Sequence, residues 1–512
     1  MGLMERLASD LPALPLDIGR IIVGAVLFVY FFNTLRQARD FSDPDGLIDH
    51  SLLCRLFPPT RVSLFQPGMP GWLFRAVFVC ACVAALMVVA GFHPRPAGAF
   101  LFLAALSTLR WNVLASYLDD AMIHIFCLWI VLLPVGSTLN VPDLLASASG
   151  NLTDPSGDLS TGPGSAAAAG TPVLDTWLAA TVPGTAPRAF IANMALVYVV
   201  AGLYKFTSPM WRDGSAMHSA LRMPIARAPG FWTLRWRTPL RLVTWAALVL
   251  EPLFALIFVL PPGMALKWLL VAGAIVFHLG IAFTLKIPYS NLAMMGAIPL
   301  ALSPEIMQGW LGAPQLERGV VARAAEPAAA SPGPAGWIAL TLVALITIQV
   351  VWEAANTGRR LRPRYSSSGW DNPVRGLLWM FGIFQSYRLF DWVDERNHHV
   401  RFEVTRVGGE PPADPGALFP QSMRHLLLQS YLVGNIWMRM SPAQLEQVRR
   451  ALLIRHARRY ARTYPDGGTI EAVAIVQRVT KDNLELTRGE RRPMMRFTCR
   501  GGRAVMHHPK EE

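Results

Sequence analysis

One lysine at the end of an apolar run is the residue best suited to chemistry in this chain. Lys205 closes the run Val197 to Tyr204, yet only five of the 47 basic residues are lysines, so 47 minus 5 leaves 42 arginines. An apolar environment favours the neutral amine, which acts as a base, whereas arginine stays charged. The alternative is that Lys205 anchors a helix end by reaching toward the membrane surface.

Few other ionisable residues fall within the apolar runs, and each needs a reason because a charge inside a bilayer costs several kcal/mol. Glu251 and His278 occupy adjacent runs, so they are able to face each other as a structural pair. Trp211 and Asp213 follow Lys205 closely and predict a polar cluster at the membrane surface. No spacing predicts a metal site. The remaining ionisable residues are Arg20, Arg75, Asp119, Asp120, His124 and Lys286.

The composition places these residues in a membrane. The 512 residues are 53% hydrophobic and 16% charged, against about 25% charged in soluble proteins. Disordered, collagen-like and disulfide-rich proteins are excluded, because the apolar content is high and only five cysteines are present. Seven apolar runs are long enough to span or nearly span a bilayer. They are 18–32, 72–92, 118–135, 190–204, 244–260, 269–285 and 337–352, with shorter ones at 97–109 and 291–302.

We therefore predict an all-α polytopic membrane bundle of about eight or nine helices over residues 1–357, followed by a small soluble α+β domain over 358–512. A flexible loop is expected at 136–187, which is rich in Ser, Gly, Ala and Pro and lacks Lys and Arg. A second linker is expected at 328–336. In the tail, strands are predicted at 399–405, 469–480 and 494–499, and a helix from Ser441 as N-cap to about Tyr464.

The positive charge is concentrated in the tail. From Arg359 onward, 26 basic minus 15 acidic residues gives +11 of the total +13. Positive charge beside membrane spans indicates either contact with anionic lipid or a role in setting the membrane topology, and we expect no nucleic-acid partner. Segments 36–70 and 212–241 and the tail are rich in arginine, so the positive-inside rule predicts them in the cytoplasm and the long loop outside. A multi-pass protein of the bacterial inner membrane is predicted.

The stretch YVVAGLYKFTSPMWRDGSAM, from Tyr198 to Met217, resembles the signature of the HTTM domain. That domain is shared by vitamin K-dependent gamma-glutamyl carboxylases and many bacterial membrane proteins. Further similarities extend over roughly 18–302: Arg20 in the first span, DPDGLI at 43–48, Trp111 with Asn112, FHLGIAFTL at 277–285 and SNLAMM at 290–295.

The resemblance implies that Lys205 is a base and His278 a second catalytic residue, with supporting roles for Asp213, Glu251, Trp211, Arg20 and Asn291. It also implies a quinone or hydroquinone as cofactor. A second catalytic histidine follows the Trp-Asn pair in the carboxylases, whereas Val113, Leu114 and Ala115 stand here. This departure argues against true gamma-carboxylation. The resemblance further implies that the Lys205 end faces the lumen or periplasm, whereas the distribution of arginines predicts that this end faces the cytoplasm.

Two functions remain open, with a transporter ranked third because no internal repeat or pair of broken helices supports it strongly. The first is an enzyme that removes a proton from a lipid-soluble or membrane-presented substrate through Lys205. The second is a maturation or assembly factor without catalysis, whose tail binds a protein or peptide client. The second is favoured by the join at 380–390 (MFGIFQSYRLF), which is similar in arrangement to lipase maturation factors.

Overall fold

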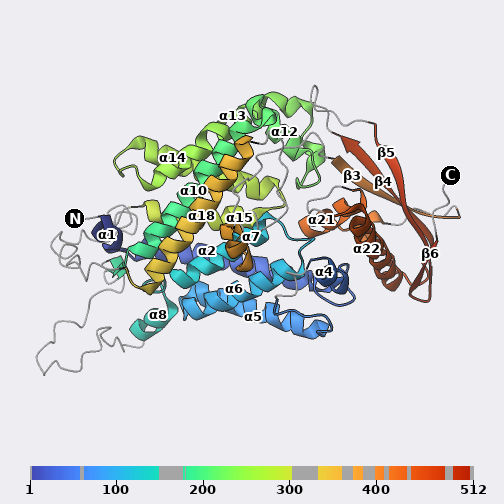
Figure 1. Cartoon of the computed structure of the whole chain (residues 1–512), viewed down its shortest axis with the longest axis horizontal. Helices are drawn as coiled ribbons and strands as arrows, with labels where there is room; N and C mark the ends of the chain where they lie inside the picture. The colour runs from blue at the N-terminus through green and yellow to red at the C-terminus, as the bar shows by residue number, and fades with distance from the viewer. Residues whose placement is uncertain are drawn as a thin grey trace, which may run out of the picture.

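The computed structural model describes residues 3–57, 63–148, 177–178, 180–302, 332–359, 373–383, 398–408, 414–434, 440–478 and 488–507. It is mostly helical, with a small sheet near the C-terminus (Figure 1). Six helical segments of the described residues are long and apolar enough to cross a membrane. They are α2 (Leu14–Arg36), α5 (Gly71–Ala90), α10 (Thr185–Thr207), α13 with its flanking turns (Leu234–Phe258), α14 (Ala265–Thr284) and α18 (Pro334–Arg359, of which Pro334–Ala355 is the apolar part).

Three further apolar segments complete the bundle but are shorter or more polar than those six. They are α6 (Pro94–Trp111), α7 (Leu118–Leu132) and the pair α15 (Pro288–Met294) and η5 (Met295–Ala301). Helix α2 and η5 pack closely because Gly19 has no side chain: a Cβ on Gly19 of α2 would lie 2.3 Å from the carbonyl oxygen of Gly296 in η5. Leucine-rich outer faces and small inner residues of this kind suit helices packed within lipid.

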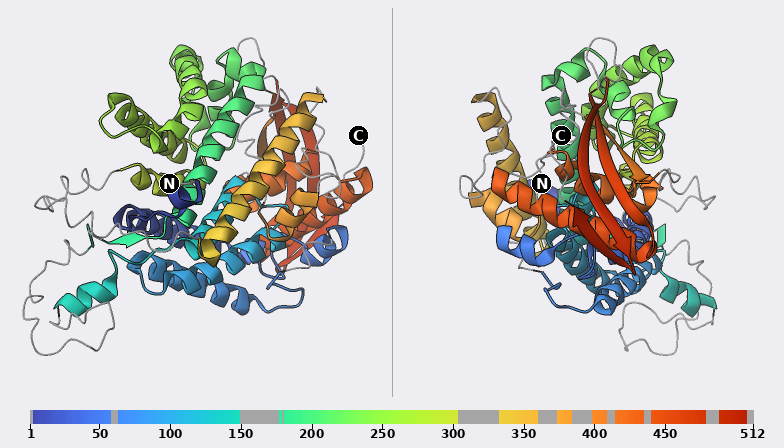
Figure 2. Two further views of the ribbon diagram at one scale, coloured as in Figure 1. Left: turned by 60° about the vertical axis from the view of Figure 1, so that its left-hand side comes forward. Right: turned by 90° about the vertical axis from the view of Figure 1, so that its right-hand side faces the viewer.

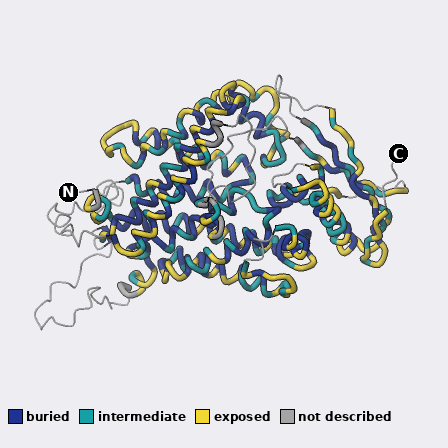
Figure 3. The backbone as a smooth tube through the Cα atoms, in the orientation of Figure 1, coloured by how far each residue is buried: buried dark blue, intermediate teal, exposed yellow. Residues whose placement is uncertain are grey.

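The helices run side by side with buried inner faces and exposed apolar outer faces (Figure 3). Helices α10 and α18 lie against each other along much of their length (Figure 2). The N-terminal ends of α2 and α10 share one end of the bundle, since β1 (Leu11–Pro12) pairs with β2 (Thr181–Val182) directly before them. The C-terminal ends of α2 and α10 therefore point to the opposite end.

The loop predicted at 136–187 is shorter than expected, because secondary structure replaces part of it at each end. The structure places helix α8 (Val141–Ala148) within its first part. Strand β2 and the first turn of α10, which begins at Thr185, lie within its last part. Asp17 explains the ordered start, because its carboxylate accepts the backbone N–H groups of Gly136 and Thr138. Residues 149–176 lie outside the described residues, as do 328–331 of the linker predicted at 328–336, whose last three residues instead form the start of α18.

The tail contains the predicted α+β domain. Strands β3 (His398–Arg406), β4 (Gly468–Arg478), β5 (Glu490–Arg500) and β6 (Arg503–His507) form an antiparallel sheet in chain order. Helix α22 (Pro442–Thr463) begins as predicted, with a capping box between Ser441 and Gln444. The sequence missed β6, α20 (Pro415–Leu418) and α21 (Met423–Leu432). Helix α19 (Pro373–Met380) precedes the sheet, and residues 384–397, which include most of the predicted join, lie outside the described residues.

Bundle and tail share one hydrophobic core at their junction. Segments α3 (Ala38–Phe41) and α4 (His50–Leu56) follow the first span and pack against α21, α22 and the sheet. Phe41, Leu53 and Leu114 of the bundle belong to the same buried cluster as Phe419 and Leu452 of the tail. The boundary expected at 357/358 therefore does not separate two independent cores.

Ion pairs reinforce the junction. Asp40 accepts a hydrogen bond from His425 (2.9 Å) and pairs with Arg459. Burial raises the pKa of Asp40, but the hydrogen bonding and charge of these two partners outweigh burial, so its pKa lies below the ordinary value. Deeper in the bundle, Arg424 donates to Asp120 at 2.5 Å, and Asp120 also accepts from the Tyr30 hydroxyl at 2.5 Å.

Two neutral histidines in the junction predict that stability falls in mild acid. Burial lowers the pKa of His50 to about 3 and that of His456 to about 4. Each imidazole N–H donates to a backbone carbonyl, Nε2 of His50 to Phe41 and Nδ1 of His456 to Leu418. Below about pH 6.5 the unfolded chain binds these protons and the folded chain does not, so each histidine removes up to about 1.4 kcal/mol per pH unit down to its folded pKa.

We expect thermal unfolding in detergent to show this loss between pH 6.5 and 4.5. His50→Gln and His456→Asn each keep the donating nitrogen and should flatten the pH dependence. His507→Gln, on an exposed histidine of β6, is the control and should leave it unchanged. An unaltered slope in both junction variants would contradict the assignment.

Candidate functional site

Helix α10 carries the predicted base into a buried ion pair. Lys205 lies in the last turn of α10, and its Nζ donates to both carboxylate oxygens of Glu251 in α13, at 2.7 and 2.6 Å. The side chains are 3% and 5% exposed. Trp211 of the short helix α11 (Pro209–Arg212) closes the pair from the membrane surface, because Nζ lies 5.3 Å from the centre of its ring system.

A glycine allows α10 and α13 to approach closely enough for this pair. A Cβ on Gly202 would lie 2.5 Å from Cδ and 2.9 Å from the backbone nitrogen of Pro252, the residue after Glu251. Pro252 also leaves α13 without one backbone donor in its last turn, where the helix passes into the 3-10 segment η4 (Phe254–Phe258). The local sequence thus fixes Glu251 directly opposite Lys205.

A second polar group lies deeper along the same helix. Tyr198 precedes Lys205 by seven residues, which is two helical turns or about 10 Å, and therefore lies on the same face. Its hydroxyl lies 2.8 Å from Nε2 of His278 in α14. On the other side of the ring, Nδ1 of His278 lies 3.1 Å from Oδ1 of Asn291 in α15.

The hydrogen bonds of Asn291 define the protonation of this group. Nδ2 of Asn291 donates to the carbonyl oxygen of Ile287, so its Oδ1 is the acceptor that faces His278. Nδ1 of His278 therefore carries the proton, and Nε2 accepts the hydroxyl proton of Tyr198. The arrangement is a fixed chain of three side chains contributed by three helices.

The expectation that His278 faces Glu251 is not what the structure shows. Both oxygens of Glu251 are held by Lys205, while the two nitrogens of His278 are held by Tyr198 and Asn291. The physical reason is register. The carboxylate lies one turn from the membrane end of α10, whereas His278 packs two turns deeper, beside Phe254 and Tyr198.

Two of the supporting residues, Asp213 and Arg20, belong neither to the Lys205–Glu251 pair nor to the Tyr198–His278–Asn291 chain. Asp213 is exposed, and its carboxylate accepts the backbone N–H of Ser215, so it closes the turn after α11. Arg20 lies near the start of α2, at the opposite end of the bundle, where it pairs with Asp17 and donates to the carbonyl oxygens of Val88 and Leu139. Arg20 therefore ties three chain segments together and does not join the Lys205 group.

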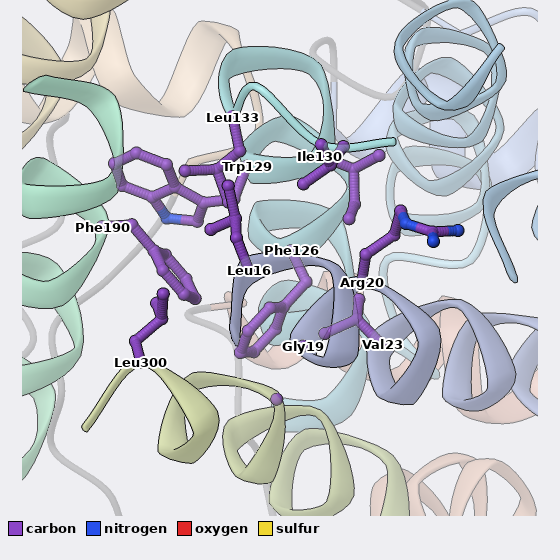
Figure 4. Close-up of a pocket in the computed structure, with 12 residues that line it drawn as sticks. Leu16, Gly19, Arg20, Val23, Phe126, Trp129, Ile130, Leu133, Phe190 and Leu300 are labelled. Atoms are coloured by element: carbon purple, nitrogen blue, oxygen red, sulfur yellow. The ribbon is translucent and has the colours of Figure 1, made fainter. Parts of the chain in front are cut away.

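A small cavity beside Arg20 is lined by aromatic and aliphatic side chains from α2, α7 and α10 (Figure 4). The guanidinium of Arg20 points away from Trp129 and Phe190 in this view. The cavity holds about 20 Å³, against roughly 300 Å³ or more for most small-molecule sites. It has room for little more than one water molecule.

Sequence reasoning missed Tyr198 and the junction residues Tyr30 and Arg424. Tyr198 had a usable signal, because its seven-residue spacing from Lys205 places both on one helix face. Arg424 had none, since its partner Asp120 lies 304 residues earlier in the chain. In the part of the chain that the structure describes, no group of three His, Cys, Asp or Glu side chains is placed to hold a metal ion.

The chain matches no known family, curated protein or solved structure in the comparisons made with each. What the site can do follows from its geometry alone. A buried amine and carboxylate in contact can exchange one proton, and apolar surroundings strengthen their electrostatic coupling to any group that approaches them.

Proposed function

We propose that this protein is an HTTM-type multi-pass membrane enzyme that removes a proton from a lipid-soluble or membrane-presented substrate. The observation that carries the proposal is the contact of Lys205 Nζ with both oxygens of Glu251, buried between α10 and α13. Pairs of ionisable groups inside a membrane are expensive and are found mainly where protons or ions are handled. The resemblance around Tyr198 to Met217 assigns the same role to Lys205.

The proton balance of this step is simple. Within the pair, the ammonium of Lys205 first passes one proton to the carboxylate of Glu251, which leaves a neutral amine beside a carboxylic acid. An acidic substrate then gives its proton to this amine, so the substrate anion is left beside the ammonium of Lys205 while Glu251 stays protonated. Lys205 and Glu251 are the catalytic residues in this proposal. Tyr198, His278 and Asn291 are positioning residues, because their hydrogen bonds hold α14 and α15 against the deeper part of α10.

Access from the lipid supports a membrane-presented substrate. Residues next to the pair on its own two helices face outward and are apolar: Leu203 and Phe206 on α10, and Val249 and Leu253 on α13. A lipophilic substrate that approaches between these helices would reach the pair without crossing water. Such burial also excludes competing protonation by solvent.

A quinone site does not follow from the residues present. Nζ of Lys205 is occupied by Glu251, and the cavities beside Arg20 and between α4 and α22 lie elsewhere. The cavity beside Arg20 is far too small for a quinone ring. We therefore derive no step through a quinone.

We further propose nine membrane crossings, with the arginine-rich end in the cytoplasm and the bacterial inner membrane as location. The shorter segments α6, α7 and α15 with η5 supply the three crossings beyond the six long helices. Support comes from the shared position of the arginine-rich segments. Residues 36–57 pack into the core of the tail, and Met423 of the tail packs against Leu221 and Leu240 of the 212–241 segment.

The test compares lipid extracts of cells that produce the wild-type protein, Lys205→Arg or Lys267→Arg. Arginine keeps the charge of Lys205 but cannot act as a base at neutral pH. We expect mass spectrometry to find a product that depends on wild-type protein, is lost at least about 100-fold in Lys205→Arg and persists in Lys267→Arg. A folded Lys205→Arg protein with an unchanged lipid profile would refute the enzyme.

A maturation or assembly factor is the second candidate, and one observation favours it. Strand β6 forms an edge of the tail sheet, with Val505 55% exposed and Met506 36% exposed. An open edge with apolar side chains is suited to adding a client strand. Under this alternative, Val505→Asp abolishes the function of the protein in the cell and Lys205→Arg does not. If the protein is an enzyme, Lys205→Arg abolishes that function and Val505→Asp does not.

A further inference from the structure

The six arginines of helix α22 differ in their partners. One group docks the helix on the bundle: Arg459 pairs with Asp40, Arg462 with Asp45, and Arg455 donates to the carbonyl oxygens of Pro44 and Gly46. A fourth, Arg449, pairs with Glu446 within the helix. Among the described residues, Arg450 and Arg458 have no carboxylate partner, so their charge is available to another molecule.

The unpaired arginines line a cleft between α22 and α4. Gln447, Arg450, Ile454 and Arg458 recur at three- and four-residue intervals and so share one face of α22. Helix α4 contributes Arg55 from the opposite wall, and it too has no carboxylate partner among the described residues. The cleft encloses about 350 Å³, which is enough for a small polar ligand.

The lining of the cleft combines positive charge with an apolar floor. Leu52, Ala451 and Ile454 form the floor. The one carboxylate at the cleft, that of Asp49, accepts the backbone N–H of Leu52 and lies 3.6 Å from Arg455. The negative charge of Asp49 is therefore balanced within the protein. The charge at the opening of the cleft comes from Arg55, Arg450 and Arg458.

The cleft lies at the membrane surface by chain connectivity. Helix α4 belongs to the connection between the spans α2, which ends at Arg36, and α5, which begins at Gly71. Both ends of this connection are therefore held at the membrane surface. Arg75, in the first turns of α5, pairs with Asp43 of the same connection and fixes this level.

We propose that the cleft between α4 and α22 binds the phosphate of an anionic phospholipid headgroup. Guanidinium groups from two helices match phosphate oxygens by paired hydrogen bonds, and the apolar floor suits the glycerol part of a lipid. Basic pockets at the ends of membrane spans bind lipid headgroups in this manner. The site is separate from Lys205, so it stands whether or not the proton-transfer function does.

The test measures retention of phosphatidylglycerol and of phosphatidylcholine by the purified full-length protein in detergent, by native mass spectrometry. We expect the wild-type protein to prefer phosphatidylglycerol, and Arg450→Gln/Arg458→Gln to weaken its binding by about tenfold or more. Arg496→Gln/Arg500→Gln on the sheet removes the same charge and is the matched control. Both variants alter exposed side chains, and Arg450→Lys/Arg458→Lys should keep part of the preference.

Three outcomes decide the proposal. Loss in the cleft variant alone supports it. Equal loss in both glutamine variants would show a diffuse charge effect and overturn it. Displacement of the lipid by excess inorganic phosphate, with no preference between the two lipids, would show a phosphate site and overturn the lipid assignment.

Discussion

Replacing Glu251 by leucine should lower the free energy of unfolding by about 3–5 kcal/mol, because it leaves the ammonium of Lys205 buried without its carboxylate. The contact is short, 2.6 Å, and both side chains are almost fully buried. In such buried surroundings, hydration by water cannot replace the contact that the ammonium of Lys205 loses. An SDS titration of the protein in bicelles, followed by tryptophan fluorescence, measures the change.

The double variant Lys205→Met/Glu251→Leu should recover most of that stability, since two apolar side chains of similar volume replace the pair. It should nevertheless lack the product that depends on wild-type protein. Lys267→Met is the control: Lys267 lies in α14 and, among the described residues, donates to the backbone carbonyl of Leu260 and has no carboxylate partner, so its loss should cost little. A double variant as unstable as Glu251→Leu would show that packing, not charge, holds α10 against α13.

Replacing Arg424 by methionine is expected to loosen the tail from the membrane bundle by about 3–5 kcal/mol. Arg424 is 5% exposed and donates to Asp120, which is itself buried beside Tyr30. Without the guanidinium, the carboxylate of Asp120 stays buried in the bundle and loses its charged partner. Hydrogen exchange in α21, measured by mass spectrometry, should rise strongly in Arg424→Met.

Arg491→Met is the matched control for this experiment. Arg491 also pairs with a carboxylate, that of Glu403 at 2.8 Å, but its side chain is 62% exposed. Exposed pairs contribute about 1 kcal/mol or less, so exchange in α21 should stay near the wild-type rate. Adding Asp120→Asn to Arg424→Met should restore part of the protection, because asparagine still accepts the N–H of Tyr117. Equal exchange in Arg424→Met and Arg491→Met would contradict the role of the buried pair.

Local sequence determined much of the architecture. Long apolar runs must be helical within lipid, because every backbone polar group has to be paired inside the segment. The run around Lys205 was therefore recognisable as α10 without any knowledge of its neighbours. Likewise, Ser441 followed by Pro442 and Gln444 forms a capping box by local geometry, so the start of α22 was predictable to the residue.

Boundaries and pairings were harder to predict. The ordered ends of the 136–187 loop depend on Asp17 and on strand pairing with Leu11–Pro12, both more than 100 residues away. The single core at the junction could not be foreseen for the same reason. Segment 38–57 has the composition of a surface connection, and the docking of α21, α22 and the sheet buries Phe41 and Leu53.

The sequence by itself determined that this is a membrane protein with an unusual lysine in a chain of arginines. Its tertiary structure alone decided which partner that lysine takes. Residue type fixes whether a side chain can titrate, but the crossing of α10 and α13 at Gly202 and Pro252 brings Glu251, and not His278, to Lys205. Helix register is set by packing over the whole bundle, and no single span carries that information.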